Sequence, residues 1–247
     1  MNGRPLGSVE RAILVLEELA AAPGPIGTNE LARRVGINAS TVSRLLGTLE
    51  GAGFVEREAG GQRWQMGVRV VHLANAALAR FDLRGLARPL LERLTERTGE
   101  TSTLSLPAHG EGVTADFVQS PHSVSSRAEI GRASVAHATA TGKVVLAFAD
   151  GALDLIRDPL AIFTPNTLPN RAAVVAEVEA VRGRGAAEAV GEREPGLNAV
   201  AVPVMGRSGR LVAVLGVQGP ERFDAPARAA AVSELEAAAR ELVSTLR

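Results

Sequence analysis

The chain has 247 residues, which exceeds the usual size of one domain and favours two compact units. Hydrophobic residues make up 46% and charged residues 22%, as in folded globular proteins, and 27 basic residues balance 27 acidic ones, so any attraction for nucleic acid has to be local. The absence of cysteine excludes disulfides, thiolate nucleophiles, Cys-based zinc sites and iron–sulfur clusters.

The sequence shows no pattern typical of a targeting signal or a membrane span. Residues 1–8 lack the apolar core of a signal peptide, and no uncharged apolar run is long enough to cross a membrane. We therefore expect a cytoplasmic protein with no membrane partner.

Three short helices are predicted before residue 54. The first covers residues 8–20 and has an apolar stripe, with Ser8 as its N-cap. Prolines and glycines at 23–27 end it, and Thr28 is expected to cap a second helix that stops at Gly36. Asn38 is expected to cap a third helix, which ends near residue 51.

Two extended runs follow at residues 54–58 and 62–66, around the turn Ala59-Gly-Gly61, and they predict a β-hairpin. Helical spacing returns at residues 68–82 and continues in a helix at 83–98. We therefore predict an N-terminal domain at residues 1–67, a linker helix at 68–82 and a C-terminal domain at 83–247.

The C-terminal region mixes strands and helices without regular βαβ alternation, which predicts an α+β fold rather than a doubly wound parallel sheet. Strands are predicted at residues 101–106, 112–118, 124–130, 197–205 and 210–218, and further helices at residues 139–149, 171–184 and 225–246.

The third helix has a polar face opposite its apolar stripe. In a helix-turn-helix, the second helix of the pair lies in the major groove and presents short polar and cationic side chains to phosphates and base edges. Any surface helix has a polar face, but the tight spacing, the lack of acids between residues 31 and 49 and the hairpin that follows favour a winged helix-turn-helix that binds double-stranded DNA. The candidate DNA contacts are Thr28, Arg34, Ser40, Thr41, Ser43, Arg44, Thr48, Arg57 and Arg63.

Trp64 is the single tryptophan, and tyrosine is absent. The chain therefore offers almost no aromatic side chains on which the bases of a single-stranded nucleic acid could stack. We expect Trp64 in the core of the hairpin rather than stacked on a base.

Several ordered motifs resemble the isocitrate lyase regulator (IclR) family of bacterial transcription factors. They are Ser8-Val-Glu-Arg-Ala-Ile, Leu31-Ala-Arg-Arg-Val-Gly, Ser40-Thr-Val-Ser-Arg-Leu-Leu-Gly-Thr-Leu, Gly131-Arg-Ala-Ser-Val-Ala-His-Ala-Thr-Ala-Thr-Gly-Lys143, Phe163-Thr-Pro-Asn-Thr167, Gly196-Leu-Asn-Ala-Val-Ala-Val-Pro-Val204 and Gly219-Pro-Glu-Arg-Phe223. The resemblance covers essentially the whole chain. It implies a winged helix-turn-helix, a linker helix and a GAF-like effector-binding domain, assembled as homodimers or homotetramers on palindromic operators.

The resemblance also implies an effector pocket in the C-terminal domain. In members that bind small, highly oxidised acids, main-chain groups matching Ala140 and Thr141 meet the carboxylate, and a helix N-terminus favours anions. The chain departs from the family pattern at four positions, which predicts fewer small hydroxyls and a larger, less polar effector such as an aromatic acid. These positions are Ala199 for a common Cys, Ala189 for a common acid, and Gly216 and Gln218 for two serines. The predicted effector-binding residues are Gly131, Ala140, Thr141, Ala189, Glu192, Ala199, Gly216 and Gln218.

Three further polar residues have alternative interpretations. His137 fits a capping or packing role better than a ligand contact. Lys143 follows Gly142, but the P-loop pattern fails because Val144 replaces the required Ser or Thr, and we expect a structural lysine. Glu192 lies either at the pocket rim or exposed on a loop.

Two other classes of protein were weighed against a ligand-responsive regulator. An enzyme is disfavoured because Gly183-Arg-Gly185 lacks the third glycine of a dinucleotide motif, and no nucleophile elbow or zinc helix occurs. No cofactor or metal is expected. A C-terminal domain that serves only as an oligomerisation scaffold remains the main alternative, and it would show no stabilisation by a ligand.

Overall fold

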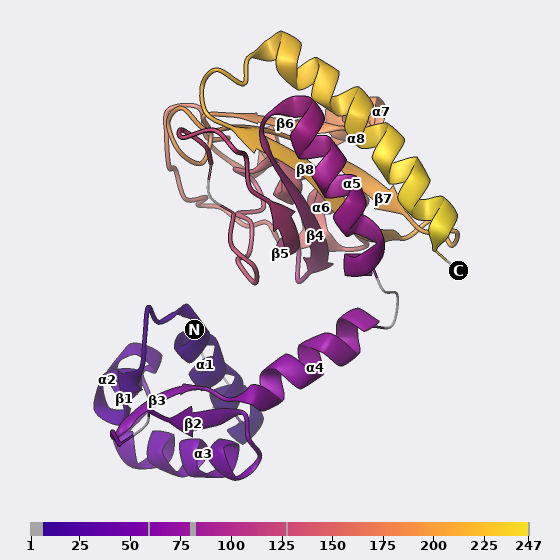
Figure 1. The fold of residues 1–247 in the computed structure, drawn as a ribbon. Helices are drawn as coiled ribbons and strands as arrows, with labels where there is room; N and C mark the ends of the chain where they lie inside the picture. Colours follow the sequence, from indigo (N-terminus) through magenta and orange to yellow (C-terminus); the bar gives the residue numbers. More distant parts are fainter. Residues whose placement is uncertain (1–6, 59, 80–82, 127, 247) are drawn as a thin grey trace. The chain divides into compact units, whose positions relative to one another are not determined.

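The computed structural model describes residues 7–58, 60–79, 83–126 and 128–246, in two compact units, Met1–Arg80 and Phe81–Arg247 (Figure 1). The predicted linker helix falls in the first unit as far as residue 79, and its predicted last residues, 80–82, lie outside the described residues. Ala59 of the predicted hairpin turn also lies outside them.

The N-terminal unit is a helix-turn-helix with a small sheet. Its helices are α1 (Ser8–Ala21), α2 (Thr28–Val35), α3 (Ala39–Gly51) and α4 (Val68–Ala79), and its strands are β1 (Ile26–Gly27), β2 (Val55–Arg57) and β3 (Arg63–Met66). The strands are antiparallel in the order β1-β3-β2. Pairing of β1 with β3 was not predicted, because a two-residue strand has no pattern to detect.

Helix ends in this unit test the predicted caps. Asn38 caps α3 as predicted, since its side-chain oxygen accepts a hydrogen bond from the Thr41 N–H at 2.8 Å. Gly36 ends α2 as predicted, in a left-handed conformation with φ of 67° that favours glycine. The other two caps were wrong by one residue, because Gly7 and Gly27 precede the helices and Ser8 and Thr28 are their first residues.

A buried cluster fixes the packing of the three N-terminal helices against the sheet. It contains Val15 and Leu19 from α1, Leu31 from α2, Leu46 from α3 and Trp64 from β3. Trp64 is only 3% exposed, which confirms the prediction that it lies in the core.

The C-terminal unit is built on one five-stranded sheet. Its strands, all antiparallel to their neighbours, have the order β5-β4-β8-β7-β6. The strands are β4 (Thr101–Ala108), β5 (Glu111–Val118), β6 (Ala187–Val190), β7 (Asn198–Met205) and β8 (Leu211–Gly219), and the helices are α5 (Leu83–Thr98), α6 (Ala140–Phe148), α7 (Arg171–Arg184), α8 (Ala225–Thr245) and the 3-10 helix η1 (Ala152–Leu155). The predicted α+β fold is confirmed.

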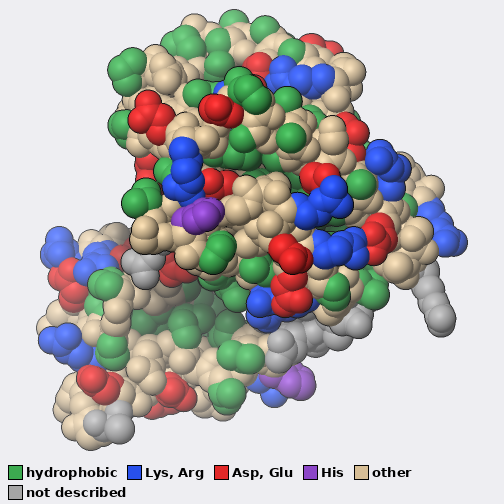
Figure 2. Space-filling model, turned by 45° about the horizontal axis from the view of Figure 1, so that its top comes forward, with side chains coloured by type: hydrophobic (Ala, Val, Ile, Leu, Met, Phe, Trp, Pro, Cys, Tyr) green, Lys and Arg blue, Asp and Glu red, His purple; other side chains and the backbone are tan. Residues whose placement is uncertain are grey.

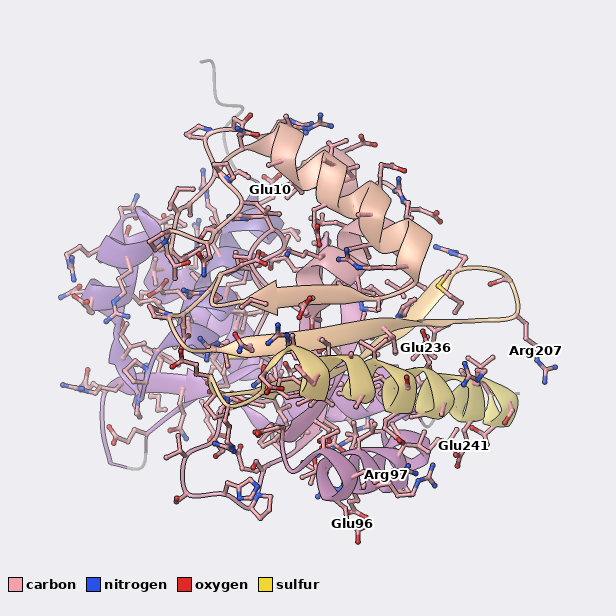
Figure 3. All side chains as sticks on the ribbon, turned by 90° about the horizontal axis from the view of Figure 1, so that it is seen from above. Glu10, Glu96, Arg97, Arg207, Glu236 and Glu241 are labelled. Atoms are coloured by element: carbon pink, nitrogen blue, oxygen red, sulfur yellow. The ribbon has the colours of Figure 1, made fainter. Side chains whose placement is uncertain are left out.

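Helices cover both faces of this sheet. α5 and α8 lie side by side on one face, where ion pairs Arg93–Glu241 and Arg97–Glu234 join them (Figure 3). α6 lies on the other face with α7 outside it, and their valines and alanines form a buried core with the inward residues of β6, β7 and β8. The face of the molecule seen in Figure 2 intersperses basic and acidic side chains, in agreement with the balanced charge.

One strand prediction for this unit was wrong, and one strand was missed. The predicted strand at residues 124–130 is irregular at its described residues, since the Ser126 hydroxyl donates to the Gln218 carbonyl and the Ser126 carbonyl accepts from Thr101 Oγ1. Side-chain hydrogen bonds therefore replace a strand ladder there. Strand β6 was missed because its alanines lack the β-branched character of a strand. No helix in the described part of the chain is long and apolar enough to span a bilayer.

Candidate functional site

Helix α3 presents a continuous polar face to solvent. Ser40, Ser43, Arg44, Gly47 and Thr48 are exposed at helical spacing, whereas Val42 and Leu46 are fully buried on the opposite side. Thr41, also predicted as a DNA contact, is half-buried, and its N–H donates to the Asn38 cap.

The polar groups of this face differ in how far they are engaged. The Ser40 hydroxyl donates to Asn38 Oδ1 at 2.9 Å, and the Thr48 hydroxyl donates to the Arg44 carbonyl at 3.1 Å. Among the described residues, the Arg44 guanidinium has neither an ion pair nor a hydrogen bond. Arg44 is therefore the free cation on this face, able to donate to a phosphate or to a guanine edge.

Arg34 and its neighbour Arg33 are held by acids. Glu30 accepts hydrogen bonds from both arginines, at 2.6 Å from Arg33 and 2.8 Å from Arg34, and Glu18 lies 3.1 Å from Arg34. These hydrogen bonds lower the pKa of Glu30 to about 2. Residues 31–49 contain no acid, but Glu30 lies directly before them and pairs with both arginines. Helix α2 therefore has less free positive charge than the sequence implied.

The two arginines predicted for the wing lie on different faces of the hairpin. Arg57 pairs with Trp64 across β2 and β3, its guanidinium lies 4.4 Å from the centre of the indole ring, and it also pairs with Glu50 at 3.4 Å. Arg63 precedes Trp64 on β3 and therefore points to the opposite face. Its guanidinium is 3.4 Å from the Pro25 carbonyl and is exposed.

Thr28 serves the interior of this unit. Its hydroxyl accepts a hydrogen bond of 2.9 Å from Trp64 Nε1. A buried indole N–H needs such a partner, so the hydroxyl of Thr28 is already engaged in positioning the wing on α2.

A cavity of about 480 Å³ opens beside the start of α6 in the C-terminal unit. Two of the predicted effector-binding residues, Thr141 and Gln218, line it. The other lining residues among those described are Thr103, Ser105, Thr114, Ser125, Ser126, Ala128, Glu129, Arg132, Ala133, Ser134, Val135, Thr139, Arg193, Glu194 and Leu197.

The predicted residues on the strands form one cross-strand row beneath α6. Ala189 pairs with Ala199, and Ala199 pairs with Gln218. Gly216 lies two residues before Gln218 in β8 and therefore on the same face of the sheet. Ala189 is buried in the core under α6 and Ala199 packs against it, so only the Gln218 end of the row reaches the cavity. Ala140, at the first turn of α6, is also buried in that core.

Gly131 and Glu192, also predicted to bind the effector, do not line the cavity, although their neighbours Arg132 and Arg193 do. Gly131 sits in an exposed turn with φ of 82°, and its N–H donates to the Thr114 carbonyl. Glu192 is buried and is therefore not an exposed loop acid.

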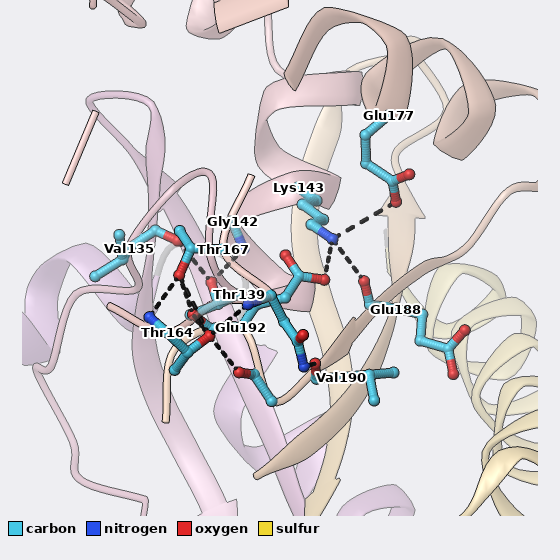
Figure 4. A network of polar contacts seen from close by, with 12 residues as sticks. Val135, Thr139, Gly142, Lys143, Thr164, Thr167, Glu177, Glu188, Val190 and Glu192 are labelled. Atoms are coloured by element: carbon cyan, nitrogen blue, oxygen red, sulfur yellow. Dashed lines mark hydrogen bonds and ion pairs between the residues drawn. The ribbon is translucent and has the colours of Figure 1, made fainter. Parts of the chain in front are cut away.

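Glu192 belongs to a buried ionic network around Lys143 (Figure 4). Lys143 Nζ donates to Glu192 Oε1 at 2.6 Å and to the Glu188 carbonyl at 2.8 Å, and Glu177 Oε1 lies 3.6 Å away. Burial raises the pKa of Glu192, and its Oε2 has no hydrogen-bond partner. The lysine is structural, as predicted, because it anchors the loop after β6 to α6.

The same loop is held from its other side by two buried threonines. Thr167 Oγ1 donates to the Glu192 carbonyl at 2.6 Å, and Thr164 Oγ1 donates to the Gly191 carbonyl at 2.7 Å. His137 Nε2 lies 2.9 Å from the Ala161 carbonyl, and its ring packs against Phe163, in agreement with the predicted packing role. These contacts fix the segment that carries Arg193 and Glu194 to the cavity.

The cavity residues that sequence reasoning missed come from three places. Thr103, Ser105 and Thr114 belong to β4 and β5, and Arg132 and Arg193 lie on loops. A signal existed for the first two, because polar residues at alternate positions 101, 103 and 105 of a predicted strand share one face. The loop arginines have no such signal.

Comparison with known proteins finds a family match for each of the two units. The model described as "Bacterial transcriptional regulator IclR C-terminal" matches residues 75–244, and "IclR helix-turn-helix domain" matches residues 8–59. The HTH-type transcriptional regulator BhcR of Paracoccus denitrificans is 34% identical over 241 residues, which cover 95% of this chain and 85% of the relative. The HTH-type transcriptional repressor AllR of Escherichia coli is 27% identical over 216 residues, with coverages of 86% and 80%.

A solved structure from Silicibacter, described as an IclR transcriptional regulator, has a TM-score of 0.86 and 31% identity, and the match covers 96% of this chain and 95% of that one. Family models, relatives and fold thus agree over nearly the whole chain. The chain belongs to the IclR family of bacterial transcriptional regulators, which are DNA-binding proteins and not enzymes.

Proposed function

We propose that this regulator binds palindromic double-stranded DNA as a homo-oligomer and represses transcription until a small organic acid occupies the cavity of its C-terminal unit. In this proposal residues 1–67 read the DNA, residues 68–82 link the domains, and residues 83–247 bind the effector. A repressor named among its relatives supports the mode of action. Its target is DNA, so the proposal includes a cytoplasmic location.

The observation that carries the DNA-binding part is the exposed polar face of α3 with the free guanidinium of Arg44. The test is fluorescence anisotropy on duplex DNA from upstream of the coding region. Arg44→Ala is expected to weaken binding by about 1–3 kcal/mol and to relax preference at one base pair. Arg207→Ala removes the same charge from an exposed turn of the other unit and is the matched control. Equal affinities for both variants would remove Arg44 from the interface.

Exposed apolar side chains support the homo-oligomer. Val9 and Ile13 lie four residues apart on α1 and are 73% and 48% exposed, and Val68 and Val71 on α4 are 76% and 57% exposed. Such residues on two helices of one unit favour burial against a second copy. Val71→Asp is expected to shift the sedimentation coefficient towards the monomer, and an unchanged coefficient would exclude α4 from the contact.

The effector part is supported by the cavity beside the N-terminus of α6. Free N–H groups at a helix N-terminus favour a carboxylate, and Thr141 adds a hydroxyl at that end. Aromatic acids, favoured by the sequence, are one class to test by calorimetry and 4-hydroxybenzoate is a suitable probe. Thr141→Val is expected to weaken acid binding. A C-terminal unit that no acid stabilises, and an operator affinity that no acid changes, would favour the oligomerisation scaffold.

A further inference from the structure

The floor of the cavity is built from hydroxyl side chains on three elements. Thr103 and Ser105 lie on β4, Ser105 pairs with Thr114 on β5, and Thr141 descends from α6. Thr103 pairs with Gly216 of β8. Alternation along β4 places Thr103 and Ser105 on the same face of the sheet, the face under α6.

Two glycines make room for this arrangement. A Cβ atom added at Gly112 would lie 2.5 Å from Thr141 Cγ2 and 3.5 Å from Ser105 Cβ. A Cβ atom added at Gly216 would lie 2.9 Å from Thr103 Oγ1 and 3.6 Å from Thr141 Oγ1. The side chains of Thr103, Ser105 and Thr141 therefore gather over two positions where the sheet has no side chain.

Three of these hydroxyls are not used by the protein. Within the described residues, Ser105, Thr114 and Thr141 have no hydrogen-bond partner for their side chains, although Ser105 is only 2% exposed. The other serines of the cavity are engaged, as Ser125 accepts from Gln119 Nε2 at 2.9 Å and Ser134 accepts from the Gly112 N–H at 2.9 Å. Thr114 and Thr141 are half-buried and all three residues line the cavity, so their hydroxyl oxygens are open to it. A ligand that displaces water from these oxygens has to pair with them, because a hydroxyl that loses its hydrogen bonds costs free energy.

The rest of the lining argues against an aromatic ligand. No aromatic side chain is present among the described lining residues, and the apolar ones, Ala128, Ala133, Val135 and Leu197, are small or few. An aromatic ring would bury apolar surface against the unpaired hydroxyls and leave them unsatisfied. The charged lining residues balance, with Arg132 lying 3.9 Å from Glu194, so a single carboxylate is best received by the N–H groups at the start of α6.

We propose that the cavity selects a hydroxylated aliphatic acid, in which hydroxyl groups near the carboxylate hydrogen-bond to Ser105, Thr114 and Thr141. This inference rests on the proposed effector function and names its ligand class. A cavity of about 480 Å³ accommodates an acid of about three to six carbons together with water. The larger and less polar effector expected from the sequence is replaced here by a polar one.

The test uses the full-length protein and pairs of acids of equal chain length, with and without hydroxyl groups. The pairs are glycerate with propionate and gluconate with hexanoate, and 4-hydroxybenzoate represents the aromatic class. Dissociation constants come from isothermal titration calorimetry. At least one hydroxylated acid is expected to bind about tenfold or more tightly than its partner, since a site built to pair with a hydroxyl discriminates against the analogue that lacks it.

Variants separate a specific contact from a general loss of structure. Ser105→Ala is expected to lower the affinity for the hydroxylated acid about tenfold and to leave the affinity for the unsubstituted acid of equal chain length unchanged. Ser125→Ala removes a hydroxyl from the same cavity that already has a protein partner, and it is expected to change neither affinity by more than about twofold. Thermal unfolding of both variants shows that the fold is kept.

Each outcome decides the inference. Equal or tighter binding of the unsubstituted or aromatic acids overturns it, as does binding of a hydroxylated acid that Ser105→Ala leaves unchanged. If none of the hydroxylated acids binds, the inference also fails. Operator binding measured with the same acids distinguishes failure of the ligand class from failure of the effector function. If an aromatic or unsubstituted acid alters operator affinity, the effector function stands and only the ligand class is refuted.

Discussion

Replacing Lys143 by methionine tests the buried ionic network of the C-terminal unit. The substitution keeps an unbranched side chain, one atom shorter, and removes the charge. Lys143 and Glu192 are 2.6 Å apart, and their side chains are only 3% and 11% exposed. The variant leaves the Glu192 carboxylate buried without a counter-ion and with an oxygen, Oε2, that has no hydrogen-bond partner in the wild type either.

Breaking one partner of a buried ion pair costs about 3–5 kcal/mol, because the remaining charge is uncompensated. For a unit of this size each kcal/mol corresponds to about 2–4 °C, so the melting temperature of the C-terminal unit is expected to fall by about 6–20 °C. Adding Glu192→Gln to Lys143→Met removes the unpaired charge and is expected to recover a large part of that loss.

The effect of pH follows from the pKa of Glu192. Burial raises this pKa above its ordinary value, so the folded state binds a proton more readily than the unfolded state. The associated stability is present below the ordinary pKa and is lost as the pH rises through the folded pKa. Without Lys143 the folded pKa is expected to rise further, so Lys143→Met becomes more stable as the pH is lowered from about 8 to about 5.

The two units report separately in one melting experiment. Trp64 is the only tryptophan and lies in the N-terminal unit, so its fluorescence follows that unit alone, whereas far-ultraviolet circular dichroism follows both. We expect the dichroism transition of the C-terminal unit to fall and the Trp64 transition to stay unchanged. A loss below about 1 kcal/mol, or a loss that Glu192→Gln does not reduce, would refute the assignment of an energetically coupled ion pair.

Three further substitutions test the N-terminal unit. Gly47→Ala adds a methyl group on the exposed face of α3, where nothing lies within 4 Å, so it is expected to stabilise the helix by about 0.5–1 kcal/mol and yet to weaken operator binding. The control Gly183→Ala, exposed on α7, is expected to leave operator binding unchanged. Unaltered anisotropy for both variants would show that this face of α3 does not contact the DNA. Glu30→Gln removes the acid that holds Arg33 and leaves Arg34 paired with Glu18 alone, so it is expected to steepen the dependence of DNA affinity on salt, which an unchanged slope would contradict. Thr28→Val leaves the Trp64 N–H without its acceptor and is expected to cost about 1–3 kcal/mol in the Trp64 melting curve; reduced operator affinity at an unchanged melting temperature would instead make Thr28 a DNA contact.

Local signals predicted much of the fold. The Asn38 cap, the left-handed Gly36 and the bounds of α5 (Leu83–Thr98) and α7 (Arg171–Arg184) follow from periodicity and capping, which depend on residues a few positions apart. The exposed face of α3 follows from the same periodicity. Strand β6 and the irregular segment at residues 124–130 escaped prediction, because partners elsewhere in the sheet decide those conformations.

The candidate site was less predictable, because its contacts join distant parts of the chain. Lys143 and Glu192 are separated by 49 residues, and no local pattern indicates that they pair. Ser105 of β4 and Thr141 of α6 come near each other only because both lie against Gly112 of β5. Arg57 had the charge expected of a wing contact, but its register opposite Trp64 directs it over the indole ring.

The position of β4 between β5 and β8 has a consequence for synthesis of the protein. β4 and β5 emerge early from the ribosome, yet the inner edge of β4 has its partner only when residues 211–219 have followed. Until then the nascent C-terminal unit has an open strand edge, which favours pairing with other chains. The described strands of the N-terminal unit pair only with one another, so this unit is able to fold while the C-terminal unit is still being made.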